Sequence, residues 1–193
     1  MKNKVVNIVL SGVGGQGVLV ASDVLVAVAM VAGLDSKKSE VHGMAQRGGS
    51  VVSQVRYGRK IYSPLIEKGS ADIILAFEKL EAVRYLDFLK PGGIVIINNQ
   101  QIKPLTVYFA NIPYPEDVEA ICRNKTDNVV IIDGIKISEE LGNPRVLNTV
   151  MLGVLSNYTQ FSEEHWINAI QQRVPPKTFE LNRRAFEAGR TAK

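Results

Sequence analysis

VVNIVLSGVGGQG, residues 5–17, joins an apolar run to a glycine-rich stretch and decides the fold class of this 193-residue chain. Five of the six residues 5–10 are apolar, as in a strand that is covered on both faces of a sheet. The glycines that follow fit the pattern G-x-G-x-x-G, with Gly12, Gly14 and Gly17 at its three fixed positions. This pattern after an apolar strand predicts the opening strand, turn and helix of a Rossmann-like domain.

The same glycine loop is a candidate anion site. Its first glycine permits a tight turn, its second lets a phosphate approach the backbone, and its third lets the helix pack close to the strand. The helix that follows would present unpaired N–H groups and a partial positive charge. We therefore expect a nucleotide or pyrophosphate site; a turn without a ligand is the alternative. The candidate residues are Gly12, Gly14, Gly15, Gln16 and Gly17.

Further along the chain, short apolar runs alternate with helical patterns. Strands are expected at residues 5–10, 51–56, 72–77, 93–98 and 128–133. Helices are expected at residues 15–33, 78–89, 115–123, 144–158 and 162–173. This order predicts a single Rossmann-like α/β domain over residues 1–174, with an open, mostly parallel sheet and helices on both faces.

Turn residues make two of these expectations more specific. The run 51–56 alternates apolar and polar residues, and the turn-forming YGRK follows it. We expect this strand to form a hairpin with the residues after it, at the edge or flank of the sheet. The triplet Pro91-Gly92-Gly93 is expected to end the helix over residues 78–89.

The C-terminal segment, residues 175–193, is separated from the domain by a Pro-Pro break. It carries several arginine and lysine residues and few apolar anchors. It is predicted to form a basic helical arm, which is either a solvated last helix or a segment that packs on a partner subunit.

Composition excludes several classes of protein. The single cysteine, Cys122, cannot form an internal disulfide and fits a reducing compartment, and His42 and His165 lie too far apart in sequence to suggest a metal site. The apolar run 18–34 contains Asp23, which favours a buried helix over a membrane span, and MKNKVV at residues 1–6 is not expected to belong to a signal peptide. A net charge of +4 does not indicate nucleic-acid binding. A cytoplasmic protein is expected.

A nicotinamide cofactor is disfavoured by the residues after the first predicted helix. An NAD site needs an acidic residue about 20 positions after the glycines, at the end of a second apolar strand. Asp35 has this spacing, but no apolar strand leads into it and residues 36–40 are polar. A free-standing NAD(P)-dependent oxidoreductase or nucleotide-binding module therefore remains only as an alternative.

A second loop, EVHGMAQRGGS at residues 40–50, combines glycines with polar side chains. Its glycines permit positive φ angles, and Arg47 could hold a carboxylate or phosphate through two parallel hydrogen bonds. The alternative is that Arg47 pairs locally with Glu40. We expect a binding or interface loop, at the same sheet edge as the glycine loop and as Glu78, which follows the strand 72–77.

These segments carry a resemblance to a known family. GVGGQG at 12–17, EVHGMAQRGGSVVSQVR at 40–56 and SPLIEKGSADIILAFEKLEAVR at 63–84 resemble, in this order, the gamma component of the 2-oxoacid:ferredoxin oxidoreductases. The stretch HGMAQRGGSV is most similar to the small beta subunit of the indolepyruvate enzymes. The resemblance covers most of the chain and weakens after residue 158.

The resemblance implies a role in an enzyme whose chemistry lies mainly in another chain. That family oxidatively decarboxylates 2-oxoacids to acyl-CoA and passes electrons to ferredoxin. It implies a large partner subunit that holds thiamine diphosphate, Mg and [4Fe-4S] clusters, and a small subunit that packs against it and helps to form the coenzyme A site. No residue here is expected to be catalytic or to bind metal, and the isolated chain is expected to be inactive.

By this resemblance the glycine loop is the candidate nucleotide or pyrophosphate loop, with Glu78 at the same edge. The second loop is expected to face coenzyme A or the thiamine subunit through Gly43, Met44, Gln46, Arg47, Gly48, Gly49 and Ser50.

Overall fold

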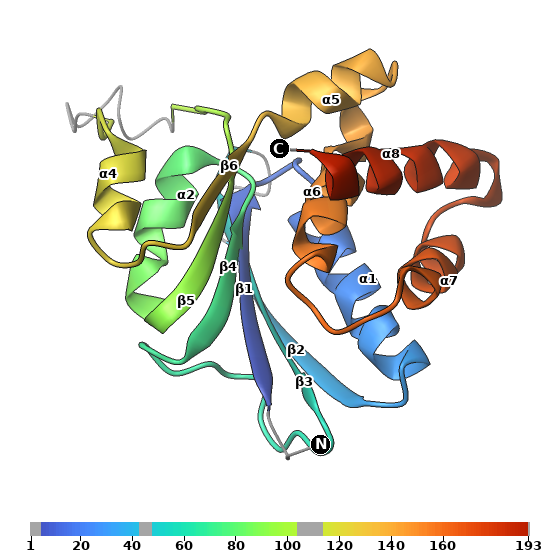
Figure 1. Cartoon of the computed structure of the whole chain (residues 1–193), viewed down its shortest axis with the longest axis horizontal. Coiled ribbons are helices and arrows are strands. Elements are labelled where there is room, and N and C mark those ends of the chain that lie inside the picture. The colour runs from blue at the N-terminus through green and yellow to red at the C-terminus, as the bar shows by residue number, and fades with distance from the viewer. Residues whose placement is uncertain (1–4, 43–47, 104–113, 193) are drawn as a thin grey trace.

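A six-stranded sheet runs through the computed structural model of the chain, which describes residues 5–42, 48–103 and 114–192 (Figure 1). Its strands are β1 (Val6–Val13), β2 (Asp35–His42), β3 (Ser50–Gly58), β4 (Ala71–Ala76), β5 (Leu89–Asn98) and β6 (Val129–Ile132). Their order across the sheet is β2-β3-β1-β4-β5-β6. The pairs β1–β4, β4–β5 and β5–β6 are parallel, whereas β3 runs antiparallel to both β1 and β2.

Helices cover both faces of this sheet. They are α1 (Val18–Val31), α2 (Lys79–Arg84), α4 (Val118–Arg123), α5 (Gly134–Glu140), α6 (Leu147–Ser156), α7 (Glu163–Arg173) and α8 (Phe179–Thr191). Short 3-10 turns lie at Leu86–Phe88, Pro144–Val146 and Pro176–Thr178. Figure 1 shows α2 and α4 on one side of the strands and α1, α6, α7 and α8 on the other. The predicted fold class is confirmed.

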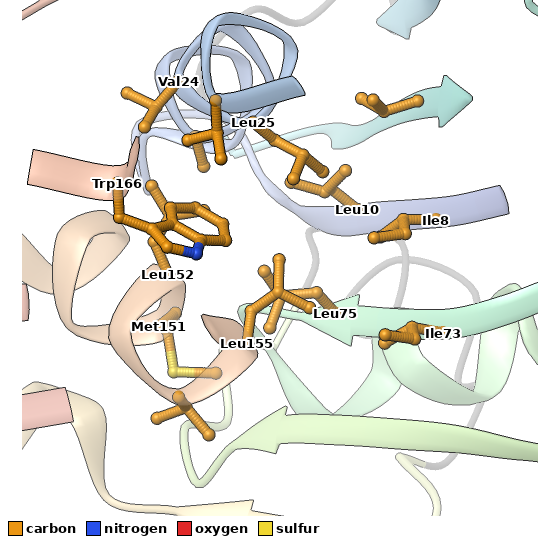
Figure 2. Close-up of a cluster of buried hydrophobic side chains, with 14 of the residues drawn as sticks. Ile8, Leu10, Val24, Leu25, Ile73, Leu75, Met151, Leu152, Leu155 and Trp166 are labelled. Atoms are coloured by element: carbon orange, nitrogen blue, oxygen red, sulfur yellow. The ribbon is translucent and has the colours of Figure 1, made fainter. Parts of the chain in front are cut away.

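The two cores follow from the alternation of side chains along the strands. Ile8 and Leu10 of β1 join the core beneath α1, α6 and α7, while Val9 between them joins the core beneath α2 and α4. Trp166 of α7 is fully buried in the larger core, among side chains of α1 and α6 (Figure 2). Leu155 lies on the side of α6 that faces the sheet.

The expected hairpin after β3 is wrong. β3 pairs instead with β1 and with the preceding strand β2, which the sequence did not predict. β2 is an outer strand of the sheet, and it lacks apolar alternation because none of its residues 35–41 is buried. Its Lys38 forms ion pairs with Asp23 of α1 and with Glu40, so this strand is held by charges as well as by its backbone ladder.

One helix boundary and one additional helix also differ from expectation. The helix predicted over residues 78–89 ends at Arg84 and continues only as a 3-10 turn, so Pro91-Gly92-Gly93 does not terminate it. These residues lie instead within β5, whose parallel ladder with β4 shifts register between Ala71 and Ile73. Helix α5 was not predicted; it is short, and Asp133 caps it by accepting from the N–H of Lys136.

The C-terminal segment forms the expected helix, α8, which packs closely on α6. A Cβ placed on Gly153 of α6 would lie 2.2 Å from the carbonyl oxygen of Phe186, and one on Gly189 of α8 would lie 2.0 Å from that of Val150. Phe186 is completely buried. The helix is therefore not solvated all round: one face belongs to the core.

Candidate functional site

The glycine loop and the second loop meet at the carboxyl end of β1. The N–H of Gly14 donates to the carbonyl of Gly49 at 2.9 Å, and the N–H of Gly48 donates to the carbonyl of Gly14 at 3.4 Å. They meet because β3 is antiparallel to β1, which sets Ser50 opposite Val13. The paired glycines of the second loop thus let two backbones lie side by side.

The glycine loop adopts a conformation that suits glycine. Gly15 and Gly17 have φ angles of 107° and 80°. At Gly12 an added Cβ would lie 2.7 Å from Cγ2 of Val18, at the start of α1. Gly17 is the N-cap of α1, and no side chain hydrogen bond caps this helix. The first turn of α1 therefore presents backbone N–H groups next to the loop.

The loop also lies at the topological switch point of the sheet. α1 follows β1 on one face and α2 follows β4 on the other, although β1 and β4 are adjacent parallel strands. Open α/β sheets bind ligands in the crevice formed there. In this chain the side chain of Gln16 spans that crevice: its Oε1 accepts from the N–H of Val13 at 2.7 Å, and its Nε2 donates to the carbonyl of Phe77 at 2.8 Å.

Two further amides complete this arrangement, which we call the amide network (Gln16, Asn98 and Gln100). Gln16 Nε2 also donates to Oε1 of Gln100 at 2.8 Å. Asn98, which is fully buried, donates to the Phe77 carbonyl and to Gln100 Oε1 and accepts from the N–H of Gly134 at 3.0 Å. The network connects the ends of β1, β4 and β5 to the start of α5. Sequence reasoning missed Gln100, whose only signal was its position just beyond β5.

A pocket of about 380 Å³ lies beside the glycine loop, bordered by the first turn of α1 and by Val51 of β3. It is lined by Val13, Gly14, Gly15, Gly17, Val18, Leu19, Val20 and Val51. Backbone from the loop and the first turn of α1 thus faces valine and leucine side chains, and none of these lining residues is charged. The volume lies in the range of small-molecule sites.

The second loop is described only from Gly48 onward. Gly43, Met44, Gln46 and Arg47 lie outside the described residues. Ser50 points to the α2 side of the sheet, where its hydroxyl donates to Glu81. Glu81 is 3% exposed and also accepts from Nε of Arg84 at 3.0 Å. The structure therefore separates Ser50 from the pocket and adds a cation, Arg84, beside the second loop.

Glu78 lies at the expected sheet edge but is 1% exposed. Its carboxylate accepts from the N–H of Glu81, the N–H of Ile102 and the hydroxyl of Tyr114, at 3.0, 3.0 and 2.6 Å. Burial, and then the adjacent Glu78 carboxylate, raise the pKa of Tyr114 well above its usual range. Glu78 thus caps α2 and hydrogen-bonds both Ile102 and Tyr114, which precede and follow residues 104–113 in the sequence.

Asp35, which has the spacing but not the setting of an NAD-site acid, lies far from the glycine loop along the sheet. It begins β2 opposite Gly58, and β2 runs parallel to β1, so Asp35 is at the amino end of the sheet. It accepts from the N–H of Ile61 at 2.8 Å, and this bond lowers the pKa of its carboxyl group. An acidic residue placed there cannot serve a dinucleotide at the glycine loop.

The described residues contain no group of three or more His, Cys, Asp or Glu side chains arranged to hold a metal ion. Within the same residues no helix has the length and apolar character needed to span a membrane. The thiol of Cys122 is buried, and burial, followed by the charge of Glu119, raises its pKa to about 11.

Comparison with known proteins identifies the family. Residues 7–192 match the family described as pyruvate ferredoxin/flavodoxin oxidoreductase. The indolepyruvate oxidoreductase subunit IorB of Thermococcus kodakarensis is 42% identical over 188 residues, which cover 95% of this chain and 93% of that protein. The gamma subunit of a keto/oxoacid ferredoxin oxidoreductase from Geobacter sulfurreducens is 26% identical, with a TM-score of 0.71 and 95% of each chain covered.

The same fold occurs within a longer chain. The 2-oxoglutarate:ferredoxin oxidoreductase of Magnetococcus marinus, solved with 2-oxoglutarate, coenzyme A and succinyl-CoA bound, is 22% identical with a TM-score of 0.74, covering 98% of this chain and 31% of that one. Sequence and fold therefore agree with the resemblance noted in the sequence. The chain belongs to the pyruvate ferredoxin/flavodoxin oxidoreductase family, as a small, gamma-type subunit of a 2-oxoacid:ferredoxin oxidoreductase.

Proposed function

We propose that this chain helps to form the coenzyme A site and the subunit interface of an enzyme that converts an aryl 2-oxoacid, with indolepyruvate as the first candidate, to its acyl-CoA. The observation that carries the proposal is the joined pair of loops beside an uncharged pocket of about 380 Å³. The choice of indolepyruvate is supported by the IorB relative, which is 42% identical over nearly the whole chain.

The division of labour follows from the residues that the chain carries. One cysteine cannot ligate a [4Fe-4S] cluster, which uses four thiolates. We place the clusters, thiamine diphosphate and Mg in a large partner subunit, which would supply decarboxylation and the path of electrons to ferredoxin. This chain contributes binding and orientation rather than a catalytic residue, and we expect the complex to be cytoplasmic.

Within the proposed coenzyme A site, backbone groups would make the first contacts. Gly14, Gly15 and Gly17 place main chain at the pocket beside the first turn of α1, where an anion gains about 0.3–1 kcal/mol. Gly12, Gly43, Met44, Gln46, Arg47, Gly48 and Gly49 complete the proposed site and its interface with the partner. Gln16, Ser50 and Glu78 are proposed to position these loops, since their side chains already bond to the protein.

The test uses the complex reconstituted with its large subunit. Val20, 43% exposed, lines the pocket, whereas Met30, 61% exposed, lies near the other end of the same helix. Val20→Glu places a negative charge where the anionic ligand would bind and is expected to raise the KM for coenzyme A about tenfold or more, equivalent to about 1.4 kcal/mol. Met30→Glu is the matched control and is expected to leave that KM unchanged.

Equal KM values for the two variants would reject the proposed coenzyme A site. A panel of aryl and alkyl 2-oxoacids assayed on the wild-type complex tests the substrate class, and preference for 2-oxoglutarate would reject indolepyruvate. Calorimetry with NAD(P) in place of coenzyme A tests the dehydrogenase alternative.

A further inference from the structure

The amide network has a defined hydrogen-bond polarity. The Val13 N–H requires an acceptor and the Phe77 carbonyl requires a donor. These two backbone groups therefore determine which end of the Gln16 amide is oxygen and which is nitrogen. The same logic orients Asn98 between the Phe77 carbonyl and the Gly134 N–H. Both amides therefore direct their NH2 groups at Gln100, whose Oε1 accepts from each, at 2.8 and 3.2 Å.

This polarity ties the shape of the glycine loop to residues far away in the sequence. Gln16 lies inside the loop, 84 positions before Gln100. The backbone of Gln100 is fixed in turn by a hydrogen bond: its carbonyl accepts from the N–H of Lys79 at 3.0 Å. Asn98 is completely buried, so the network is shielded on the side of the core. The side chain of Gln16 thus bonds the loop to Phe77 and Gln100, just beyond the ends of β4 and β5, in addition to the backbone bonds between the two loops.

We infer that Gln16, Asn98 and Gln100 are positioning residues that hold the glycine loop against the ends of β4 and β5, so that a ligand meets the loop from the pocket beside Val51. The inference rests on the proposed function, because it assigns the route by which coenzyme A meets the loop. It also accounts for a glycine pattern typical of dinucleotide sites in a chain whose own Gln16 side chain bridges the loop to the Phe77 carbonyl.

The experiment uses two substitutions that add the same charge to the same side-chain skeleton. Gln16→Glu replaces the donor that faces the Phe77 carbonyl and Gln100, so two hydrogen bonds are lost and acceptors face each other. Gln100→Glu keeps an acceptor toward both NH2 groups, so its hydrogen bonds persist. In the reconstituted complex, Gln16→Glu is expected to raise the KM for coenzyme A about tenfold with kcat within about twofold, and Gln100→Glu to match the wild type.

Gln100→Leu removes the acceptor and is expected to behave like Gln16→Glu; Gln101→Leu, at an exposed neighbouring position, is the control and is expected to behave like the wild type. Hydrogen exchange of the backbone amides of residues 12–17 is the second readout. It is expected to accelerate in Gln16→Glu and Gln100→Leu and to stay slow in Gln100→Glu. This readout needs no coenzyme A, so it tests the network even if Val20→Glu rejects the proposed function.

Equal effects of Gln16→Glu and Gln100→Glu, in either readout, would overturn the inference, because charge rather than hydrogen-bond polarity would then explain them. Unchanged loop exchange in Gln100→Leu would also overturn it. If Gln16→Glu fails to fold, the comparison of Gln100→Leu with Gln100→Glu decides the question.

Discussion

Glu78 illustrates how one buried carboxylate can organise the edge of a sheet. Its two oxygens accept from three donors, which belong to Glu81, Ile102 and Tyr114. An acidic residue directly after a strand suggested a ligand contact from sequence. The tertiary structure surrounds it instead with donors from its own chain, and hydrogen bonds to a buried charge are among the stronger ones in proteins.

The Glu78→Gln variant is therefore expected to be much less stable than the wild type. An amide NH2 cannot accept from the Tyr114 hydroxyl or from a backbone N–H, so at least one buried donor loses its partner. We expect a loss of about 2–3 kcal/mol in the free energy of unfolding, measured by urea denaturation. Glu116→Gln, at an exposed position, is the control. A loss below about 0.5 kcal/mol for Glu78→Gln would contradict this role.

Cys122 makes stability sensitive to alkaline pH. Burial raises the pKa of its thiol from 9.0 to about 11, so the folded protein keeps the proton while the unfolded chain releases it above about pH 9. The unfolded state then binds fewer protons, and the stability contributed by the neutral thiol is lost as pH rises from about 9 to 11. Cys122→Ala is expected to show a shallower decline over this window. Identical slopes in urea titrations of both proteins would refute the assignment.

At the scale of elements, α6 and α8 depend on two glycines that let their backbones approach. Gly189 has no room for a methyl group, because a Cβ there would lie 2.0 Å from the carbonyl oxygen of Val150. Helix propensity and packing make opposite predictions for Gly189→Ala. Alanine favours an isolated helix by about 1 kcal/mol, whereas overpacking a helix contact costs about 1–3 kcal/mol or more.

Packing is expected to decide the outcome for Gly189→Ala, since the neighbouring atoms are backbone and cannot rotate away. We expect a net destabilisation of about 2 kcal/mol, seen as a lower midpoint of thermal unfolding. Arg184→Ala, at an exposed position on α8, is expected to stay within about 0.5 kcal/mol of the wild type. An increase in stability for Gly189→Ala would mean that propensity outweighs the contact.

At the scale of the whole molecule, the C-terminal segment belongs to the same core as the sheet. Truncation after Val174 removes α8 and with it Phe186, which is completely buried against Trp166 at a ring-centroid distance of 5.7 Å. We expect the truncated chain to be insoluble or to unfold at a temperature more than about 10 °C lower, because losing one buried Phe alone costs about 3–5 kcal/mol. A truncated chain with normal thermal stability that fails only to bind the large subunit would show that residues 175–193 act as a separate arm.

Much of the fold was determined by the sequence alone, where local chemistry is strong. β1, β4 and β6 overlap the residues predicted as strands, although β1 extends to Val13 and β4 begins one residue early, because strands covered on both faces are apolar throughout. The start of α7 also follows from local chemistry: the Ser162 hydroxyl accepts from the N–H of His165, and Glu163 and Glu164 lie in the first turn. The glycine pattern likewise determined the turn between β1 and α1, since φ angles such as that of Gly17 exclude most other residues.

Only the tertiary structure decided which loops meet and which side chains remain open to a ligand. None of residues 35–41 of β2 is buried, so no apolar pattern revealed this strand, and its direction places Asp35 at the wrong end of the sheet for a dinucleotide. Gln16, Asn98 and Gln100 are ordinary amides in sequence and become a network only when parallel strands bring their carboxyl ends together. Sequence determines what each residue can donate or accept; the long-range pairing of strands decides which partner it finds.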